Sequence, residues 1–302
     1  MTGASGFVGR RIVHALARDG HHVVSFGRRS LPELTAPLSN YRSWDLRSAL
    51  DVTPAVDAVV HCGALVGDWG AESEYHAVNV GGTQAVIDSF PNARIVHVST
   101  SSVYSDSQPT TTISESAHTG NCRYSAYART KAAAEQLLLQ RGNSAVLRPH
   151  IVYGPGDSTL LPRLLAARRF NTLFLPGSGN NMLSVTHVDN LVDAVVAAVV
   201  ARPDAQGAFN IADAEHATLR VLLQSFLSRL GQSTRLVFIP EVVTMAAASA
   251  LEQLWPGDTP PRGPMLTRYV VLQLAMNHIL DISRAREHLA YRPRWDFRTG
   301  SL

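Results

Sequence analysis

The chain carries, close to its start, the glycine-rich stretch Thr2-Gly3-Ala4-Ser5-Gly6-Phe7-Val8-Gly9. Apolar residues then recur at helical spacing, at Val8, Ile12, Val13 and Leu16. Glycines allow a tight turn and a close approach of the backbone, and amides at a helix N-terminus attract a pyrophosphate. The stretch therefore predicts a dinucleotide-binding turn rather than a purely structural one. The expected contacts are Gly3, Ser5, Gly6, Phe7 and Val8.

A strand should precede this turn, yet only Met1 and Thr2 stand before Gly3. We expect that the first strand is truncated at the start of this sequence. Analysis of the N-terminus of the native protein would test this hypothesis.

Short apolar runs alternate with amphipathic helices along the chain. The runs span residues 22–26, 58–61, 94–98, 146–151 and 207–211, with helical patterns over 78–89 and 128–140. This alternation predicts an α/β protein with a Rossmann-type, doubly wound parallel sheet. We expect a dinucleotide-binding domain over residues 1–150, to which the run at 207–211 returns as a strand. Residues 151–302 should form mainly a smaller C-terminal substrate-binding lobe.

The composition is that of an ordinary soluble enzyme. The 302 residues are 45% hydrophobic and 17% charged, and the net charge of +3 is spread without basic runs, which disfavours nucleic acid as a partner. The two cysteines, Cys62 and Cys122, suggest neither a disulfide framework nor a metal site. We expect a cytoplasmic protein without a transmembrane segment, acting on a small molecule and compatible with a homodimer.

The second strand ends without a carboxylate, in Ser25-Phe26-Gly27-Arg28-Arg29. Most NAD-binding proteins place an acidic residue there to bind the ribose hydroxyls. Arg28, and with it Arg29, can instead pair with a 2′-phosphate, because a guanidinium offers a fixed fork of donors. The sequence therefore favours NADP(H) and leaves NAD(H) open, with solvated surface arginines as the alternative interpretation.

Tyr127 and Lys131 form a Y-x-x-x-K motif, which on a helix places both side chains on one face. A neighbouring ammonium favours the phenolate and lowers the pKa of the phenol, so that Tyr127 can exchange a proton with a carbonyl. Lys131 is the only lysine in the chain, and arginine is a poor substitute for a compact ammonium. We therefore predict that this pair is catalytic, and that Tyr124, which has no lysine at the same offset, is not.

Several hydroxyl side chains follow the run at 94–98, in Ser99-Thr100-Ser101-Ser102-Val103-Tyr104. Ligands bind beyond the carboxyl ends of parallel strands, so one of these hydroxyls should hold a substrate carbonyl beside Tyr127. The others are expected to form turns.

Together these motifs resemble the extended short-chain dehydrogenase/reductase superfamily, also called the NAD-dependent epimerase/dehydratase group. The resemblance covers nearly the whole chain and includes Asn79-Val80-Gly81-Gly82-Thr83 and Arg148-Pro149-His150-Ile151-Val152-Tyr153-Gly154-Pro155. It implies that Thr100 is the hydroxyl partner of Tyr127, with Ser101 as second choice, and that Lys131 also binds the nicotinamide ribose. It further implies cofactor contacts at Asp45, Leu46, Cys62, Gly63, Ala64, His150 and Val152.

The resemblance also bears on the substrate. Nucleotide-sugar enzymes of this group usually carry an arginine before a His-Val pair, whereas this chain has Leu183 before His187-Val188. Other segments, including Gly179-Asn180-Asn181, resemble the 3β-hydroxysteroid dehydrogenase-like branch. We expect an NADP(H)-dependent oxidoreductase that interconverts a secondary alcohol and a ketone, of the 3-hydroxy/3-oxo type, on a largely apolar substrate. A nucleotide-sugar epimerase, dehydratase or reductase is the alternative, and a non-catalytic NADP-binding module a weaker one. The apolar segment 242–254 could line a pocket, abut a membrane or pack in the core.

Overall fold

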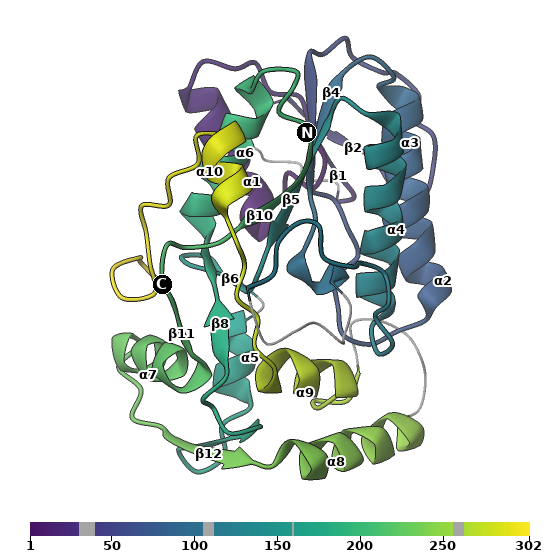
Figure 1. Cartoon of the computed structure of the whole chain (residues 1–302). Helices are drawn as coiled ribbons and strands as arrows, with labels where there is room; N and C mark the ends of the chain where they lie inside the picture. Colours follow the sequence, from purple (N-terminus) through teal and green to yellow (C-terminus); the bar gives the residue numbers. More distant parts are fainter. Residues whose placement is uncertain (30–39, 105–111, 159, 256–262) are drawn as a thin grey trace.

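A computed structural model describes residues 1–29, 40–104, 112–158, 160–255 and 263–302. A parallel sheet forms its upper part in Figure 1, with helices on both faces. The strands are β1 (Ser25–Gly27), β2 (Tyr41–Ser43), β3 (Ala58–His61), β4 (Arg94–Val98), β5 (Ser144–Pro149) and β10 (Gly207–Ile211). The Rossmann-type fold predicted from the alternating pattern is confirmed.

The sheet is continuous through Thr2. Strands β10, β5, β4 and β3 lie side by side, and β1 pairs with β2, all in parallel. Thr2 bridges Phe26 of β1 and His61 of β3, so Met1 and Thr2 occupy the place of a strand between them. The turn that follows therefore lies in the middle of the sheet, where the strand order reverses and ligands bind in such folds.

Two layers of helices cover the sheet. Helices α1 (Phe7–Arg18) and α6 (Val188–Val200) lie together on one face, with α10 (Ser283–His288) against β10. The other face carries α4 (Ala126–Arg141) and the helical run formed by α2 (Glu72–Tyr75), a π-helical stretch (His76–Gly81) and α3 (Gly82–Ser89). Strands β4, β5 and β10 are buried on both faces, as expected for a parallel sheet between helices.

Two strands end differently from the prediction. The pattern placed one strand over 146–151, whereas β5 stops at Pro149 because Ile151 adopts a φ of 40° that a strand does not allow. The apolar run at 22–26 becomes the three-residue strand Ser25–Gly27.

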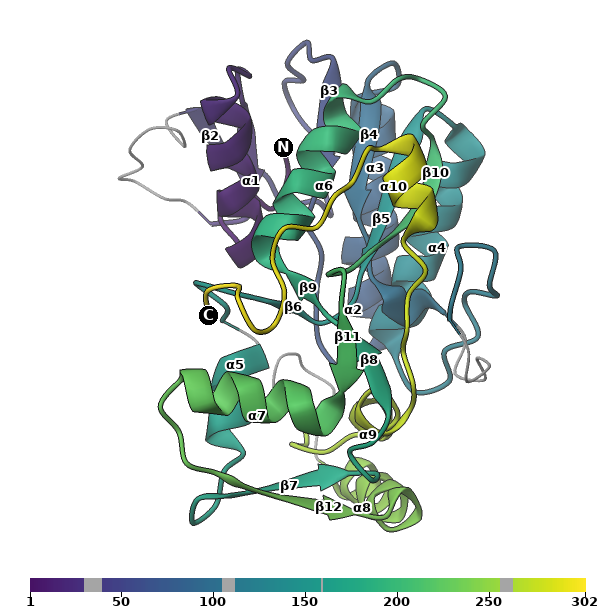
Figure 2. The same ribbon diagram turned by 60° about the vertical axis from the view of Figure 1, so that its left-hand side comes forward.

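A smaller lobe lies below the sheet. It contains short strand pairs: β6 (Val152–Tyr153) with β9 (Thr186–His187), β7 (Thr172–Pro176) with β12 (Arg235–Ile239), and β8 (Met182–Ser184) with β11 (His216–Thr218). Its helices are α5 (Leu160–Ala166), α7 (Leu219–Arg229), α8 (Glu241–Leu254) and α9 (Arg268–Ala275). Figure 2 shows β7, β12 and α8 at the end farthest from the sheet. Among the described residues, no helix is both long enough and apolar enough to cross a bilayer.

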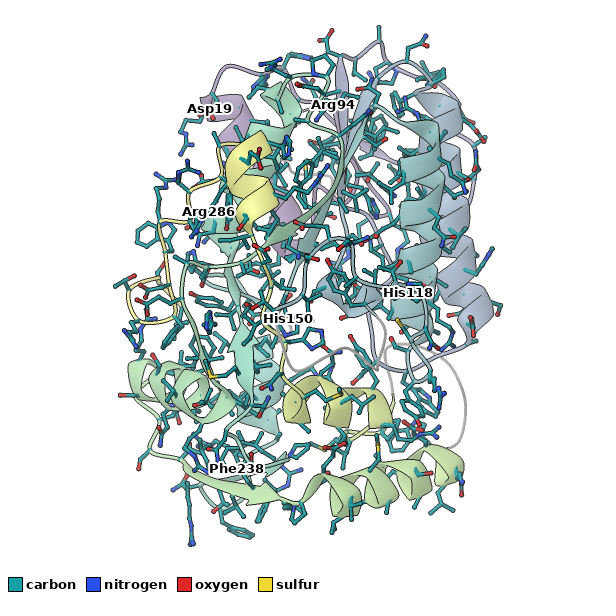
Figure 3. The ribbon with its side chains drawn as sticks, viewed as in Figure 1. Asp19, Arg94, His118, His150, Phe238 and Arg286 are labelled. Atoms are coloured by element: carbon teal, nitrogen blue, oxygen red, sulfur yellow. The ribbon has the colours of Figure 1, made fainter. Side chains whose placement is uncertain are left out.

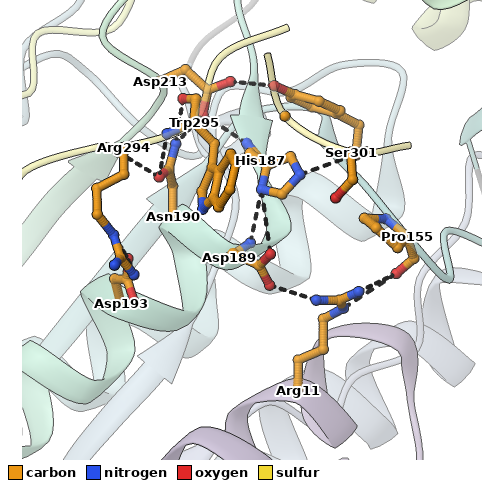
Figure 4. A network of polar contacts seen from close by, with 12 residues as sticks. Arg11, Pro155, His187, Asp189, Asn190, Asp193, Asp213, Arg294, Trp295 and Ser301 are labelled. Carbon is orange, nitrogen blue, oxygen red and sulfur yellow. Dashed lines mark hydrogen bonds and ion pairs between the residues drawn. The ribbon is translucent and has the colours of Figure 1, made fainter. Parts of the chain in front are cut away.

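A polar network joins the two parts (Figure 4). Arg11 of α1 pairs with Asp189 at the start of α6, at 2.5 Å, and donates to the carbonyl of Pro155. The buried carboxylate of Asp213 accepts from the backbone amide of His187 and from the side chain of Asn190, both at 2.7 Å. These bonds tie the start of α6 to the segments that line the site.

Candidate active site

Two of the three glycines in the glycine-rich turn are required by close backbone contacts within the protein. Gly3 has a φ of 69°, and a β-carbon there would lie 2.7 Å from the amide nitrogen of Gly63. A β-carbon at Gly9 would lie 2.0 Å from the carbonyl oxygen of Gly3. A β-carbon at Gly6 would meet only that same oxygen, at 3.4 Å, in ordinary contact. Close contacts within the protein therefore require glycine at Gly3 and Gly9. At Gly6, the missing side chain leaves the turn open towards the cavity.

Helix α1 begins at this turn with its amides open. Gly6 is its N-cap, no side chain caps the helix, and the first turn contains no acidic residue. Unpaired amides and the positive end of a helix dipole favour an anion such as a pyrophosphate. The turn thus fits a dinucleotide.

A cavity of about 710 Å³ runs from this turn along the carboxyl ends of the strands. It brings together these sequence-predicted residues: Gly3, Ser5, Gly6, Phe7, Val8, Arg28, Asp45, Leu46, Cys62, Gly63, Ala64, Thr100, Tyr127, Lys131 and Val152. His150 does not line it. Its ring is 2% exposed, stacks on His278 with ring centres 4.6 Å apart, and lies at the junction of the sheet and the lower lobe (Figure 3).

Arginines occupy the end of the cavity beside β1. Arg28 and Arg29 are exposed, and Tyr41 holds the turn by donating to the carbonyl of Arg29 at 2.8 Å. Asp45 pairs with Arg47 at 2.5 Å, a hydrogen bond that lowers the pKa of the carboxyl to about 2. Asp45 is therefore a charged carboxylate at neutral pH, on a different strand end from the two arginines.

Tyr127 lies in the first turn of α4, which Ser125 caps by accepting from the amide of Ala128 at 3.0 Å. Burial raises the pKa of the phenol above its ordinary value, Tyr269 acts in the same direction, and a hydrogen bond with Thr100 opposes both. The pKa of Tyr127 is thus raised, whereas the lysine neighbour alone was expected to lower it. Tyr127 is accordingly a protonated acid at neutral pH.

Thr100 and Ser101 face different partners. Thr100 lines the cavity with Tyr127 and acts to lower the pKa of its phenol, whereas the hydroxyl of Ser101 lies 2.7 Å from Nδ1 of His150. The choice of Thr100 first and Ser101 second as the hydroxyl partner of Tyr127 stays a prediction.

A chain of hydroxyls continues from Thr100 into the lower lobe. Thr100 donates to Ser102 at 3.1 Å, and the hydroxyl of Ser102 lies 2.8 Å from that of Tyr269 in α9. The sequence did not single out Tyr269, because nothing in its local pattern links α9 to the carboxyl end of β4. The lower lobe thus contributes a polar side chain to the surroundings of Tyr127.

Lys131 is 2% exposed and lines the cavity one helical turn after Tyr127. Its Nζ donates to the carbonyl of Val98 at 2.8 Å and lies 2.9 Å from Nε2 of His97. Burial lowers the pKa of the ammonium to about 8. Sequence reasoning also missed His97; a histidine between the apolar residues Val96 and Val98 was the available signal.

These elements define a dinucleotide-binding oxidoreductase site with a tyrosine acid and a lysine in one cavity. The model of the NAD dependent epimerase/dehydratase family matches residues 1–212. The chain belongs to this family, within the extended short-chain dehydrogenase/reductase superfamily, and is an enzyme of its NAD(P)-dependent oxidoreductase type.

Similar proteins include several reductases. The chain is 32% identical to a 2-alkyl-3-oxoalkanoate reductase of Stenotrophomonas maltophilia, over 99% of this chain and 96% of that one. It is 28% identical to a 3beta-hydroxysteroid-dehydrogenase/decarboxylase of Arabidopsis thaliana, over 97% of this chain and 58% of that one. A solved structure of UDP-glucuronic acid 4-epimerase from Bacillus cereus with NAD covers 99% of this chain and 94% of its own, with a TM-score of 0.75 and 22% identity, and shows the same fold.

Proposed function

We propose that the chain interconverts a ketone and a secondary alcohol, of the 3-oxo/3-hydroxy type on a largely apolar substrate, with NADP(H). The single cavity that is lined by Thr100, Tyr127, Lys131 and the glycine turn carries this proposal. The arrangement supplies a proton donor and an oxygen-binding hydroxyl side by side.

The chain's residues handle the proton while the nicotinamide supplies or takes the hydride. In reduction, the Thr100 hydroxyl turns its hydrogen from Ser102 to the carbonyl oxygen, and Tyr127 transfers its phenolic proton to that oxygen as negative charge develops. The Lys131 ammonium stabilises the phenolate that remains. In oxidation, the phenolate takes the proton back from the hydroxyl group.

The preference for NADP(H) rests on the end of β1. Arg28 and Arg29 are exposed at the cavity, and Asp45, which follows the neighbouring strand β2 and lines the same cavity, is paired with Arg47. Guanidinium groups match a 2′-phosphate, which NAD(H) lacks.

Leu183 supports an apolar substrate rather than a nucleotide sugar. It is fully buried in β8, in a core cluster of the lower lobe with Tyr153, Leu175 and Phe226. An arginine could not fill that position without burying a charge. Relatives named for 3-oxoalkanoate and hydroxysteroid chemistry agree with this choice.

The lower lobe has an apolar face beyond the cavity. Val242, Val243 and Leu254 of α8 are 79%, 53% and 80% exposed, so this helix is only partly in the core.

We propose that residues 151–302 are mainly the substrate-binding part, although α6, β10 and α10 return to the sheet. A homodimer and a cytoplasmic location remain predictions.

The proposal can be tested by mixing the protein with NADPH and either a 2-alkyl-3-oxo acid or a 3-oxosteroid. The absorbance of NADPH then reports its oxidation. We expect turnover with at least one of these ketones and a slower rate with NADH. Thermal stabilisation by a UDP- or dTDP-sugar, without turnover of any ketone, would overturn it in favour of the nucleotide-sugar alternative.

A further inference from the structure

Lys131 is held from inside the protein by two acceptors. It is the only lysine of the chain, and its ammonium donates to the carbonyl of Val98 at 2.8 Å and contacts Nε2 of His97 at 2.9 Å. An ammonium has three N–H groups. With two of them directed at β4, one remains for the cavity that Lys131 lines.

His97 is suited to accept from an ammonium. The ring is 1% exposed in β4 and packs against that of His61, with ring centres 4.9 Å apart. Burial lowers the pKa of His97 well below its ordinary value, and the positive charge of Lys131 acts in the same direction. A neutral imidazole has one nitrogen that accepts and one that donates, so Nε2 accepts and Nδ1 carries the proton.

With Nε2 directed at Lys131, Nδ1 of His97 has no good acceptor among the described residues. Nδ1 of His97 is buried without a hydrogen bond of good geometry among the described residues, although the backbone of His61 acts weakly on the ring. A buried donor with so poor a hydrogen bond gains little stabilisation from it. The well-formed side-chain hydrogen bond of this ring is the one between Nε2 and Lys131.

The other groups near Lys131 do not replace His97. Glu135 favours the charged ammonium from a distance, but its carboxylate is bound by Arg148 and Ser99. Burial raises the pKa of the Cys62 thiol to about 11, so this thiol is uncharged. His61 is neutral and lies between the hydroxyls of Thr2 and Thr83.

We propose that His97 is a positioning residue of the reaction, whose Nε2, together with the Val98 carbonyl, orients the Lys131 ammonium and keeps it protonated beside Tyr127. This inference rests on the proposed function for its catalytic meaning. The contact itself can be tested without any substrate.

The solitary lysine makes that test direct. Protein labelled with ¹³C at lysine Cε has a single lysine resonance, whose shift against pH follows the ionisation of Lys131. We expect a midpoint near 8 in the native chain. In His97→Leu the midpoint should fall by about one pH unit, because a hydrogen bond to the charged form is lost. In His97→Gln, the amide oxygen can accept a hydrogen bond from the ammonium, so the midpoint should return most of the way to its native value.

The control is His278→Leu, which removes another buried histidine and should leave the midpoint unchanged. If His97→Leu does not fold, His97→Phe removes the acceptor while keeping a ring of similar size. An unchanged midpoint in a folded variant without the acceptor overturns the inference. If the ketone assays fail while the midpoint shifts as expected, the proposed function is wrong and the contact stands.

Activity provides the second measurement. With a ketone that the native enzyme reduces, His97→Leu should lower kcat by about tenfold with little change in the melting temperature, and His97→Gln should recover part of it. Equal kcat values for the native enzyme and His97→Leu would show that the contact does not position Lys131 for the reaction.

Discussion

Gly9 packs so closely on Gly3 that a β-carbon added to it would lie 2.0 Å from the Gly3 carbonyl oxygen. Gly6, between them, has no such restriction, since its β-carbon would be 3.4 Å from that oxygen and its φ of −79° suits any residue. Gly6→Ala should therefore affect cofactor binding, and Gly9→Ala should affect the stability of the fold.

Gly6→Ala should weaken cofactor binding by about tenfold or more and leave the melting temperature nearly unchanged, because only the approach of a pyrophosphate is obstructed. Gly9→Ala should lower the free energy of unfolding by about 3 kcal/mol or more, because helix α1 must move away from the turn. Cofactor titration and thermal unfolding measure both effects. Equal cofactor affinity of Gly6→Ala and the native chain would remove the case for this turn as the pyrophosphate site.

Tyr127→Phe removes the proton donor and keeps the ring. We expect kcat for ketone reduction to fall by roughly a hundredfold to ten-thousandfold, with cofactor affinity retained. Tyr124→Phe is the matched control, since Tyr124 packs under the guanidinium of Arg268 at 4.6 Å and a phenylalanine can do the same. Full activity of Tyr127→Phe would favour the non-catalytic interpretation of the fold.

Arg28→Ala should change cofactor choice rather than the reaction. Losing a charge-assisted pair with a 2′-phosphate should weaken NADPH binding by about tenfold to a hundredfold and leave NADH binding unchanged. Arg18→Ala is the control, because Arg18 is an exposed arginine that pairs with Asp19 and does not line the cavity. A parallel loss of both cofactors in Arg28→Ala would mean that the arginine supports the turn and does not recognise the phosphate.

Local pattern was enough to predict the sheet and most of the cavity. Glycine spacing, the Y-x-x-x-K pair and the apolar run ending at Val98 each lie within one short segment, and parallel strands bring such segments to one edge. Tyr269 and His97 were missed for a different reason. Each acts through a contact with a residue far away in the sequence, 167 positions for Ser102–Tyr269 and 34 for His97–Lys131, and no periodicity reports such a contact.

Tyr269→Phe tests the contribution of the lower lobe. The hydroxyl of Ser102 would lose one of its two hydroxyl partners and keep Thr100, and the hydroxyl chain around Tyr127 would be less firmly oriented. A hydrogen bond of about 1 kcal/mol corresponds to a several-fold fall in kcat/KM for the ketone. Cofactor affinity should not change, because Tyr269 does not line the cavity at the glycine turn. A change confined to cofactor affinity would contradict this account.

The pH dependence of the reaction separates Lys131 from Tyr127. Burial raises the pKa of the phenol above its ordinary value, so Tyr127 keeps its proton well into the alkaline range. Burial lowers the pKa of Lys131 to about 8, so the ammonium that stabilises the phenolate is lost first as pH rises. We expect kcat/KM for ketone reduction to be level near neutral pH and to fall above about pH 8, since kcat/KM reports groups of the free enzyme. In Lys131→Arg, which stays charged, the residual activity should not fall in this range. A fall at the same pH in that variant would assign the titration to another group.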